Sequence, residues 1–390
     1  MIRKVVCGMS GGVDSAVTAL ILKKRGYEVT GLFMRNWDSV NEKGECQADL
    51  DLEDAKYICR HLDIPLHEVN FIKQYWNDVF SELLKDYQKG QTPNPDIMCN
   101  KHIKFNLFQK YALEKLNGDA IATGHYARTD IGYDLDTKLK YLLIFNSCVK
   151  LLTAADSVKD QTFFLCQISQ NGLKKTIFPI GDLSKHYVRK IALEAGLEKI
   201  AKKKEVWNKF FSMGYGTFMI YIEPKEGVFR DLETGKEVGK HKGVHYWTRG
   251  QRASLAGCTQ PYFIIDINSL TNDIFVAHGT NHPALFCQTF FTEEPHWIRH
   301  PPRLLYQDQM FDAYFRFQHI HPLVKCTATL TGGNGLIVSL ERPMRAICPG
   351  QYAVFYNEDE CLGSAKILRP GPSLYTLNYK EYIDNPKEFR

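Results

Sequence analysis

The sequence lacks several features that would place it in a specialised class of protein. No run of 18 apolar residues occurs in the 390-residue chain, so no membrane-spanning helix is expected. The eleven cysteines form no Cys-x-x-Cys pair, which argues against a structural zinc site. The formal net charge of +5 permits a nucleic-acid partner but does not require one.

What the sequence contains is typical of a globular protein with more than one domain. A chain of 390 residues with 44% hydrophobic and 24% charged residues is expected to form two or three domains. Cys59, Cys166 and Cys287 lie among apolar residues, which predicts buried thiols. Scattered, unpaired cysteines favour a reducing compartment.

The stretch "CGMSGGVDSAV", residues 7–17, predicts a strand, a tight turn and the start of a helix. Gly11 and Gly12 allow close backbone approach, and Ser10 and Ser15 add hydroxyl donors. Such a turn aims free N–H groups and the positive end of a helix dipole at one point, where an anion can bind. An ordinary glycine-rich turn is the alternative, because no lysine follows the glycines as it does in a P-loop.

Asp14 is unusual in a loop that would hold an anion. A carboxylate beside a phosphate is repelled unless a cation lies between them. The simplest interpretation is a phosphate with Mg²⁺, so that Asp14 acts indirectly through the metal.

The first ~165 residues predict an α/β fold. Candidate strands at 3–9, 28–34, 65–71 and 119–125 alternate with helical stretches, which indicates a doubly wound parallel sheet. Ligands bind at the carboxyl ends of such strands. Three segments therefore become candidates, namely residues 7–15, 33–38 and 122–128. In the third, Gly124 and His125 would lie against a nucleotide, although His125 could equally be a capping or packing residue.

A second candidate site lies in "GQTPNPDIMCNKHIKF", residues 90–105. The prolines exclude a helix there, so Cys99 is expected on or just after a loop, at a helix start. Lys101 and Lys104 would favour the thiolate, and Asp96 could exchange a proton with the reacting group. The alternative is a half-buried cysteine without a role.

The rest of the chain suggests a basic segment and then β structure. Residues 171–204 hold nine Lys/Arg against three Asp/Glu, in a pattern of two helices joined near Pro179 and Gly181. This cluster could neutralise RNA phosphates or could be a solvated face. After about residue 206 the sequence predicts a small β domain and then a β-barrel. Basic and aromatic residues in "HKGVHYWTRGQR" suggest an RNA surface that includes Lys242, Arg249 and Arg252.

Several motifs in one order carry a resemblance over nearly the whole chain. The string "SGGVDS" resembles the PP-loop of the ATP pyrophosphatases. The full set resembles the tRNA-specific 2-thiouridylases: "GMSGGVDSAV", "GLFMRNWD", "TPNPDIMCNKHIKF", "ATGHYAR", "AADSVKDQTFFL", "HKGVHYWTRGQR" and "GQYAVFYNEDECLGSAKIL". Two further stretches, "NWDSVNEKGECQADLDLEDA" and "YWNDVFSELL", are most similar to the mitochondrial enzymes of animals. This family uses ATP to activate the C2 oxygen of uridine 34 and replaces that oxygen with persulfide sulfur.

The resemblance implies roles for individual residues. It assigns ATP binding to eight residues: Gly8, Ser10, Gly11, Gly12, Asp14, Ser15, Met34 and Gly124. It assigns acid–base catalysis to Asp96 and the first catalytic thiol to Cys99. It places Lys159, Asp160 and Gln161 near the target base. Together with the basic residues Lys202, Lys203, Lys204, Arg249 and Arg252, these form the expected tRNA-binding set.

The resemblance also implies an organisation and partners. We expect a catalytic PP-loop domain at 1–205 with a basic helical segment at 169–204, a central β-rich domain at 206–284, a barrel at 285–380 and a tail at 381–390. The expected cofactors are ATP and Mg²⁺. The expected partners are tRNAs of the Lys, Glu and Gln type and a persulfide donor protein, with no membrane and with the chain as a monomer. The expected compartment is the mitochondrion, although no Arg/Ser-rich presequence precedes the first strand.

One departure from the family concerns the second catalytic cysteine, which receives the persulfide. At its place this sequence has Gly216 or Phe210, depending on the register, and no cysteine occurs between Cys166 and Cys258. We favour a wrong exon, a wrong frame or a splice form, because the segment is scrambled within a close match. The alternatives are lost sulfur transfer or another thiol such as Cys258. A tRNA-binding protein without thiolation and another adenylating synthetase remain as alternative functions.

Overall fold

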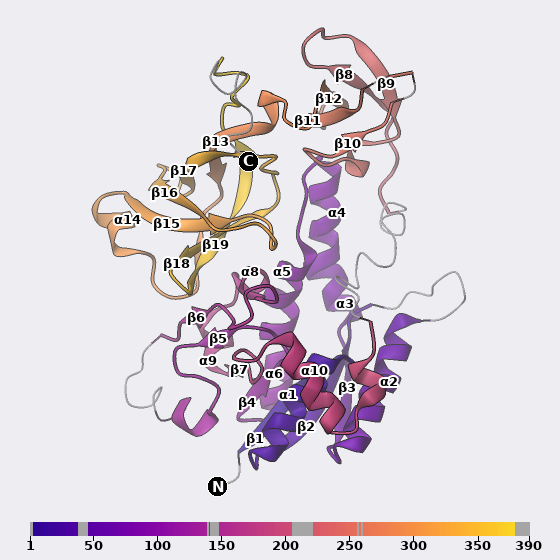
Figure 1. Cartoon of the computed structure of the whole chain (residues 1–390), viewed down its shortest axis with the longest axis vertical. Coiled ribbons are helices and arrows are strands. Elements are labelled where there is room, and N and C mark those ends of the chain that lie inside the picture. Colours follow the sequence, from indigo (N-terminus) through magenta and orange to yellow (C-terminus); the bar gives the residue numbers. More distant parts are fainter. Residues whose placement is uncertain are drawn as a thin grey trace.

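The chain folds into three sheet-based parts (Figure 1). The structure, a computed structural model, describes residues 3–37, 46–138, 140, 148–204, 221–255, 257–258 and 260–378. We call the parts the α/β domain, up to residue 204, the small β domain, residues 221–278, and the barrel, residues 286–370. Within the described ranges, no helix is long and apolar enough to cross a membrane.

The α/β domain is built on five parallel strands in the order β3-β2-β1-β4-β7. Their bounds are Lys4–Met9 for β1, Glu28–Arg35 for β2, Leu66–Asn70 for β3, Ala120–Ala122 for β4 and Thr176–Ile177 for β7. The first four match the predicted strands, so the parallel sheet is confirmed.

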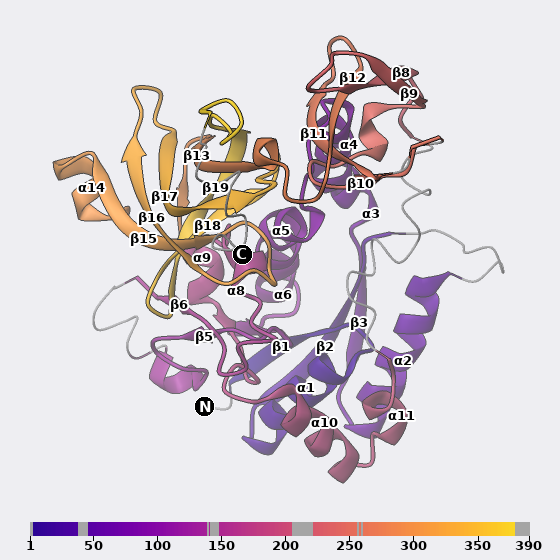
Figure 2. The ribbon, with the colours of Figure 1, turned by 45° about the horizontal axis from the view of Figure 1, so that its top comes forward.

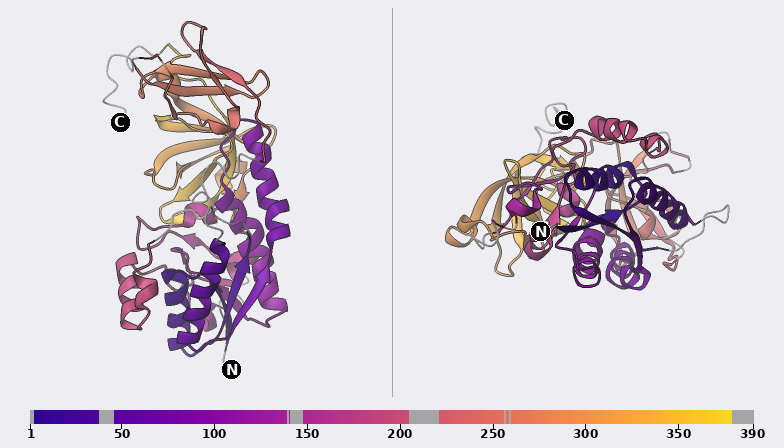
Figure 3. Two further views of the ribbon diagram at one scale, coloured as in Figure 1. Left: turned by 90° about the vertical axis from the view of Figure 1, so that its right-hand side faces the viewer. Right: turned by 90° about the horizontal axis from the view of Figure 1, so that it is seen from below.

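Helices cover both faces of this sheet, as the view from below shows (Figure 3). Val5 and Cys7 of β1 pack with α1, α2 and α10 on one face, while Val6 between them packs into the core on the other face. The bounds on the first face are α1 Val13–Lys24, α2 Gln47–His61, α10 Lys185–Glu194 and α11 Glu198–Ala201. The other face carries α3 Ile72–Tyr75, η1 Trp76–Phe80, α4 Ser81–Gln88, α5 Pro95–Cys99, η2 Asn100–Phe108 and α6 Gln109–Glu114. The doubly wound prediction is therefore confirmed.

The basic segment differs from its prediction. It contains α9, Gln170–Lys174, and α10 on either side of the predicted joint, but β7 lies between them and completes the sheet. A strand of two residues carries too little alternation to be seen in a sequence. The predicted buried thiols Cys59, Cys166 and Cys287 are all buried.

The small β domain is a five-stranded sheet in the order β10-β11-β12-β8-β9. Its elements are β8 Gly227–Asp231, β9 Glu237–His241, η3 Val244–Tyr246, β10 Arg252–Ala253, β11 Tyr262–Asn268 and β12 Asp273–His278. In Figure 1 it sits above the far end of α4. An interdomain contact lies there, because Thr92 Oγ1 donates to Thr248 Oγ1 at 3.4 Å.

The barrel is closed, because β13 pairs with both β17 and β19. Its strands are β13 Phe286–Thr292, β15 Met310–Arg316, β16 Val324–Leu330, β17 Leu336–Arg345, β18 Tyr352–Asn357 and β19 Glu360–Pro370. The short elements η4 Pro283–Leu285, β14 His296–Trp297 and α14 Arg303–Gln307 accompany them. The predicted β domain and barrel are thus confirmed.

The barrel lies beside the α/β domain (Figure 2). The two parts share a core and a sheet edge. Strands β5, Arg128–Thr129, and β6, Leu151–Leu152, extend the barrel sheet, since Leu151 pairs with Cys361 of β19. Beyond β6, the short helix α8, Thr162–Leu165, carries Phe163 and Leu165 into the same core as Tyr356 of β18. A buried ion pair between Asp160 and Arg316 also crosses this junction. Removing one partner of such a pair costs on the order of 3–5 kcal/mol, because the other charge stays buried.

Candidate functional site

The candidate site lies where the direction of strand order reverses. From β1 the chain adds β2 and β3 on one side, then crosses to β4 and β7 on the other. In such sheets the crevice outside the carboxyl ends at this switch point binds ligands. The segments that follow β1, β4 and β2 are the three that the sequence identified.

The loop after β1 has the compact form that an anion site needs. The Ser15 hydroxyl donates to Gly12 O at 3.0 Å and accepts from Ser10 N at 3.3 Å. Gly11 has φ +70°, and a Cβ there would lie 2.5 Å from Asp51 O of α2. Only glycine fits this position, so the N-terminus of α1 is fixed against α2 with its positive dipole end open to the site.

Gly124, in the loop after β4, touches the first turn of α1. A Cβ at Gly124 would lie 2.8 Å from Asp14 C and Ser15 N. The other predicted nucleotide residues lie at the neighbouring strand ends. Gly8 is near the end of β1 beside the Phe108 ring, and Met34 packs partly buried against the core behind β2.

Asp14 has a different arrangement from the predicted one. Both its carboxylate oxygens accept from Lys185 Nζ at 2.8 Å, and Oδ1 also accepts from Tyr126 OH at 2.9 Å. The indirect, metal-linked role of Asp14 stays a prediction, because a carboxylate that accepts these hydrogen bonds still has lone pairs for a cation. The cation beside the loop is the Lys185 ammonium, whose side chain is only 11% exposed.

The predicted catalytic thiol, Cys99, belongs to the short helix α5 and not to the loops after β1 and β4. Asn94 caps α5 by accepting from Ile97 N, and Pro95 occupies the first turn, where a missing N–H costs nothing. The helix begins at Pro95, so the prolines do not prevent it, and Cys99 is the last residue of α5, directly before η2, and not the helix start that was predicted. Cys99 is 8% exposed, and Asn36 Nδ2, just beyond β2, lies 4.0 Å from its Sγ.

The surroundings of Cys99 correct its expected reactivity. Burial raises the pKa of Cys99 to about 11, although Lys104 acts against this shift. Lys101 does not take part, because it donates to Gln167 Oε1 at 2.9 Å. Burial also raises the pKa of Asp96, which favours a carboxyl group able to hold a proton. The pair therefore rests as a neutral thiol beside a half-buried acid.

His125 connects the two halves of the site. Its Nδ1 lies 2.9 Å from Thr123 Oγ1, its Nε2 lies 3.5 Å from Lys104 Nζ, and its ring packs against Phe105 and Phe178. Burial and the Lys104 charge lower the pKa of His125 well below its ordinary value. His125 is therefore a neutral packing residue next to Gly124, as one of the two interpretations stated.

The three residues predicted to lie near the target base, Lys159, Asp160 and Gln161, have different surroundings. Asp160 is 2% exposed and accepts hydrogen bonds from Arg316 and Thr162, so its side chain cannot contact RNA in this arrangement. The Gln161 side chain accepts from Tyr126 N at 3.0 Å. Lys159 is half-buried, and its N–H donates to Asp156 Oδ1 at 3.2 Å.

The basic residues predicted to bind tRNA also differ, since some are exposed and others have partners within the protein. Lys202, Lys204 and Arg252 are exposed. Lys203 instead binds Asp51 Oδ1 at 3.1 Å and Asp54 Oδ2 at 2.7 Å, which holds the C-terminal end of α11 against α2. Arg249 donates from Nη2 to Ala284 O at 2.8 Å and from Nη1 to Ile265 O, so its interactions within the protein explain its position. Lys203 and Arg249 thus have partners within the protein, and their contact with tRNA stays a prediction.

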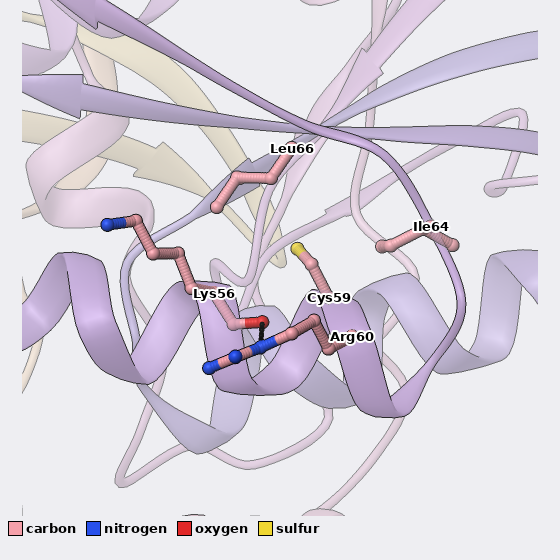
Figure 4. A pocket seen from close by; sticks show the side chains of 5 residues that line it. All are labelled: Lys56, Cys59, Arg60, Ile64 and Leu66. Carbon is pink, nitrogen blue, oxygen red and sulfur yellow. Dashed lines mark hydrogen bonds between the residues drawn. The ribbon is translucent and has the colours of Figure 1, made fainter.

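Two hollows lie away from this site. One of about 230 Å³ lies between α2 and the start of β3, lined by five residues shown in Figure 4: Lys56, Cys59, Arg60, Ile64 and Leu66. Burial raises the pKa of Cys59 there to about 12, which makes that thiol unreactive. The other, of about 580 Å³, lies where the three parts meet and includes Arg249 in its wall.

Sequence reasoning missed three residues of the site: Asn36, Tyr126 and Lys185. Asn36 and Tyr126 lie within strand-end segments that the sequence identified, so position alone could have found them. Lys185 lies 171 positions from Asp14 and enters through α10, whose approach depends on the unpredicted strand β7. Positions Gly216 and Phe210, at the place of the missing cysteine, lie outside the described residues.

The fold and the loop together define a PP-loop protein, an α/β class that holds an anion at a glycine-rich turn after its first strand. Family models agree with this arrangement. Those described as the tRNA methyl transferase HUP domain, PRC-barrel domain and aminomethyltransferase beta-barrel domain match residues 3–211, 217–278 and 287–367. The chain belongs to the tRNA-specific 2-thiouridylase family.

Curated relatives match the chain over almost its whole length. Proteins named mitochondrial tRNA-specific 2-thiouridylase 1 are 51% identical in Gallus gallus, 50% in Homo sapiens and 47% in Drosophila melanogaster. The first match covers 96% of this chain and 94% of the relative, the second 96% and 93%, and the third 95% and 95%. These names agree with the predicted family, activity and compartment.

Two of the solved structures that match the chain cover about half of it. A 4-thiouridine synthetase–RNA complex with bound ATP is 17% identical, covers 52% of this chain and 43% of its own, and has a TM-score of 0.31. The NMN synthetase of Francisella tularensis is 18% identical, covers 53% and 68%, and has a TM-score of 0.32. Likenesses this weak place no ligand here.

The buried thiol predicts a steep pH dependence of its chemical labelling. With a pKa of about 11, the thiolate fraction of Cys99 rises about tenfold per pH unit between pH 7 and 9. Iodoacetamide alkylation, followed by mass spectrometry of the peptide that contains Cys99, should rise by the same factor. Cys99→Ser removes that labelled peptide as a control. A labelling rate that levels off below pH 8 would show that the thiol is more acidic than this structure makes it.

Proposed function

We propose that this chain uses ATP to replace the C2 oxygen of uridine 34 with sulfur in mitochondrial tRNAs of the Lys, Glu and Gln type. The observation that carries the proposal is one continuous edge of the sheet. There the glycine loop of residues 10–15 meets Gly124, and His125 beside it reaches Lys104 near Cys99 and Asp96. The proposed phosphate site and the proposed thiol site would thus be joined by a single loop.

The loop after β1 would hold the pyrophosphate end of ATP. Backbone N–H groups at the start of α1, the Ser10 hydroxyl and the Lys185 ammonium would supply donors and positive charge, while Ser15, whose hydroxyl donates to Gly12 O, would turn toward the phosphate only by giving up that bond. This charge would stabilise pyrophosphate as it leaves. Mg²⁺ would arrive with the nucleotide phosphates, because Asp14 is already paired with Lys185.

The first chemical step would join the base to AMP. The C2 oxygen attacks the α-phosphorus, the bond to pyrophosphate breaks, and the N3 proton of the base passes to an acceptor. Asp96 fits that acceptor role, since a carboxyl group with a raised pKa can take up a proton and return it. The C2 oxygen, otherwise a poor leaving group, can then depart as part of AMP.

The second step would exchange sulfur for oxygen. The terminal sulfur of a persulfide bonds to C2, and AMP leaves with the original oxygen and the bonding electron pair. A second thiol then attacks the sulfur–sulfur bond, forms a disulfide with the carrier cysteine and leaves sulfur on the base. Cys99 would be one of these thiols, and the persulfide would come from a separate donor protein.

The target base would leave the anticodon stack to reach this edge. Trp37 stacks on Trp76 with ring centroids 5.9 Å apart, next to Asn36 and the Cys99 thiol. Trp76 remains 37% exposed, so aromatic surface is available for a flipped base. Exposed Lys202, Lys204 and Arg252 would contact the RNA backbone, with the chain acting as a monomer.

A second candidate function follows from the missing cysteine. Without a cysteine between Cys166 and Cys258, a chain that binds and adenylates tRNA has no family-like partner thiol to complete the transfer. A thiolation-deficient, tRNA-binding form is therefore the alternative.

The basic residues predict a selective change in salt dependence. Replacing Lys202 and Lys204 with Ala should flatten the slope of log affinity for tRNA against log salt by up to about two units, one per lost phosphate contact. Lys203→Ala is the matched control and should leave the slope unchanged, because its ammonium is paired with Asp51 and Asp54. Filter binding across a salt series measures both. If Lys203→Ala flattens the slope as much as the double variant, the division of roles is wrong.

Because the second thiol is missing, we predict that sulfur transfer stops after about one reaction per protein molecule. With tRNA, ATP and a persulfide donor, we expect repeated pyrophosphate release but no more than about one 2-thiouridine per protein molecule, because transfer by the family scheme needs two thiols. Phe210→Cys and Gly216→Cys test the two registers. With a dithiol reductant in every reaction to reopen the disulfide that each transfer forms, one of these variants should restore repeated thiolation. Nucleoside mass spectrometry counts the product.

Two outcomes would contradict this account. Repeated thiolation by the unaltered chain would place the second thiol elsewhere, with exposed Cys258 the first to test by Cys258→Ser. No tRNA-dependent pyrophosphate release would overturn the proposed activation of the base.

A further inference from the structure

The barrel holds the loop of residues 153–161, which connects β6 to α8. The Asp160 carboxylate accepts from Arg316 of β15, and its backbone oxygen accepts from the His319 ring. Arg316 is itself 8% exposed, and its Nη2 also donates to Tyr356 OH of β18 at 3.0 Å. At the other end of the loop, Thr153 N donates to Asp359 O at 2.8 Å. The loop is therefore fastened to the barrel at both ends.

The same loop holds Tyr126 of the α/β domain. Gln161 N donates to Tyr126 O at 2.8 Å, and Gln161 Oε1 accepts from Tyr126 N at 3.0 Å. Both backbone groups of Tyr126 are thus fixed by the residue that follows Asp160. The Tyr126 side chain, 2% exposed, then donates its hydroxyl to Asp14 at 2.9 Å.

A second contact runs from this loop to Lys185. Asp156 Oδ2 accepts from Lys185 N at 2.9 Å, at the first residue of α10. The Lys185 ammonium binds Asp14 and lies 5.6 Å from the centre of the Tyr126 ring. The loop therefore sets the position of both groups that hold Asp14, one through its backbone and one through the start of a helix.

We propose that Arg316 of the barrel is a positioning residue for the nucleotide site, acting through Asp160 and the loop of residues 153–161 on Tyr126 and Lys185. It touches neither nucleotide nor reacting atoms. Its ion pair fixes the loop in the one arrangement in which the Tyr126 hydroxyl and the Lys185 ammonium both reach Asp14 at the start of α1. The barrel thereby contributes to ATP binding from another part of the molecule. This inference rests on the proposed ATP site at that loop.

The test is ATP affinity of the full chain, measured by calorimetry without tRNA. Arg316→Gln should raise the Kd for ATP about fivefold or more, the lower range of coupling between distant sites, and Arg316→Lys should recover part of the loss because it restores the charge. Exposed Arg342 on β17 provides the matched control, and Arg342→Gln should leave the Kd unchanged. An Arg316→Gln protein that is folded and binds ATP within twofold of the wild type would overturn the proposal.

A double-mutant cycle separates positioning from general destabilisation. Tyr126→Phe removes only the hydroxyl that reaches Asp14, so it too should weaken ATP binding. In the double variant the two effects should not multiply, since both act on the same contact. Effects that multiply fully would show independent action and would contradict the proposal.

If the Arg316→Gln protein does not fold, the comparison of Gln161→Ala with Gln161→Glu replaces it, since only Glu keeps an acceptor for Tyr126 N. Equal ATP affinity of these two variants would then overturn the proposal.

Failure of the proposed function would be distinguishable from failure of this inference. A wild-type protein that binds ATP but releases no pyrophosphate with tRNA would contradict tRNA activation, while the affinity comparison among the variants would still decide the role of Arg316.

Discussion

The close contact between Gly124 and the first turn of α1 is the constraint on which the site depends. Any side chain at Gly124 would collide with the backbone of Asp14 and Ser15, so the loops after β1 and β4 meet with only backbone between them. This contact places His125 and Lys104 on one side and the anion loop on the other. Without it, the glycine loop of residues 10–15 and the region around Cys99 would be separate parts of one sheet edge.

Burial determines how the groups at this edge behave. The Cys99 thiol and the Asp96 carboxyl are both held toward their neutral forms, and the His125 ring is neutral as well. Fixed positive charge comes from Lys104 and from Lys185, which is paired with Asp14. An edge with a neutral thiol, a carboxyl group of raised pKa that can take up a proton, and oriented cations suits chemistry in which a proton leaves the base while negative charge builds up on pyrophosphate.

The sequence allowed prediction of what depends on local pattern. Runs such as residues 3–9 and 28–34 alternate with helices, and this pattern is sufficient for the parallel sheet and its functional edge. The short strand β7, the pairing of Lys185 with Asp14 and the burial of Asp160 under Arg316 depend on segments far apart in the chain. Reactivity was harder still, because the neighbouring lysines of Cys99 suggested a thiolate, whereas burial outweighs them.

The most direct test of the central claim follows the oxygen of the base. A tRNA transcribed with heavy oxygen at the C2 position of its uridines is incubated with the protein, ATP and sodium sulfide, so that no second thiol is needed. If the C2 oxygen attacks the α-phosphorus, the AMP released will carry the heavy oxygen, and mass spectrometry will detect it. AMP that forms together with 2-thiouridine but contains only ordinary oxygen would contradict activation of the base by adenylation.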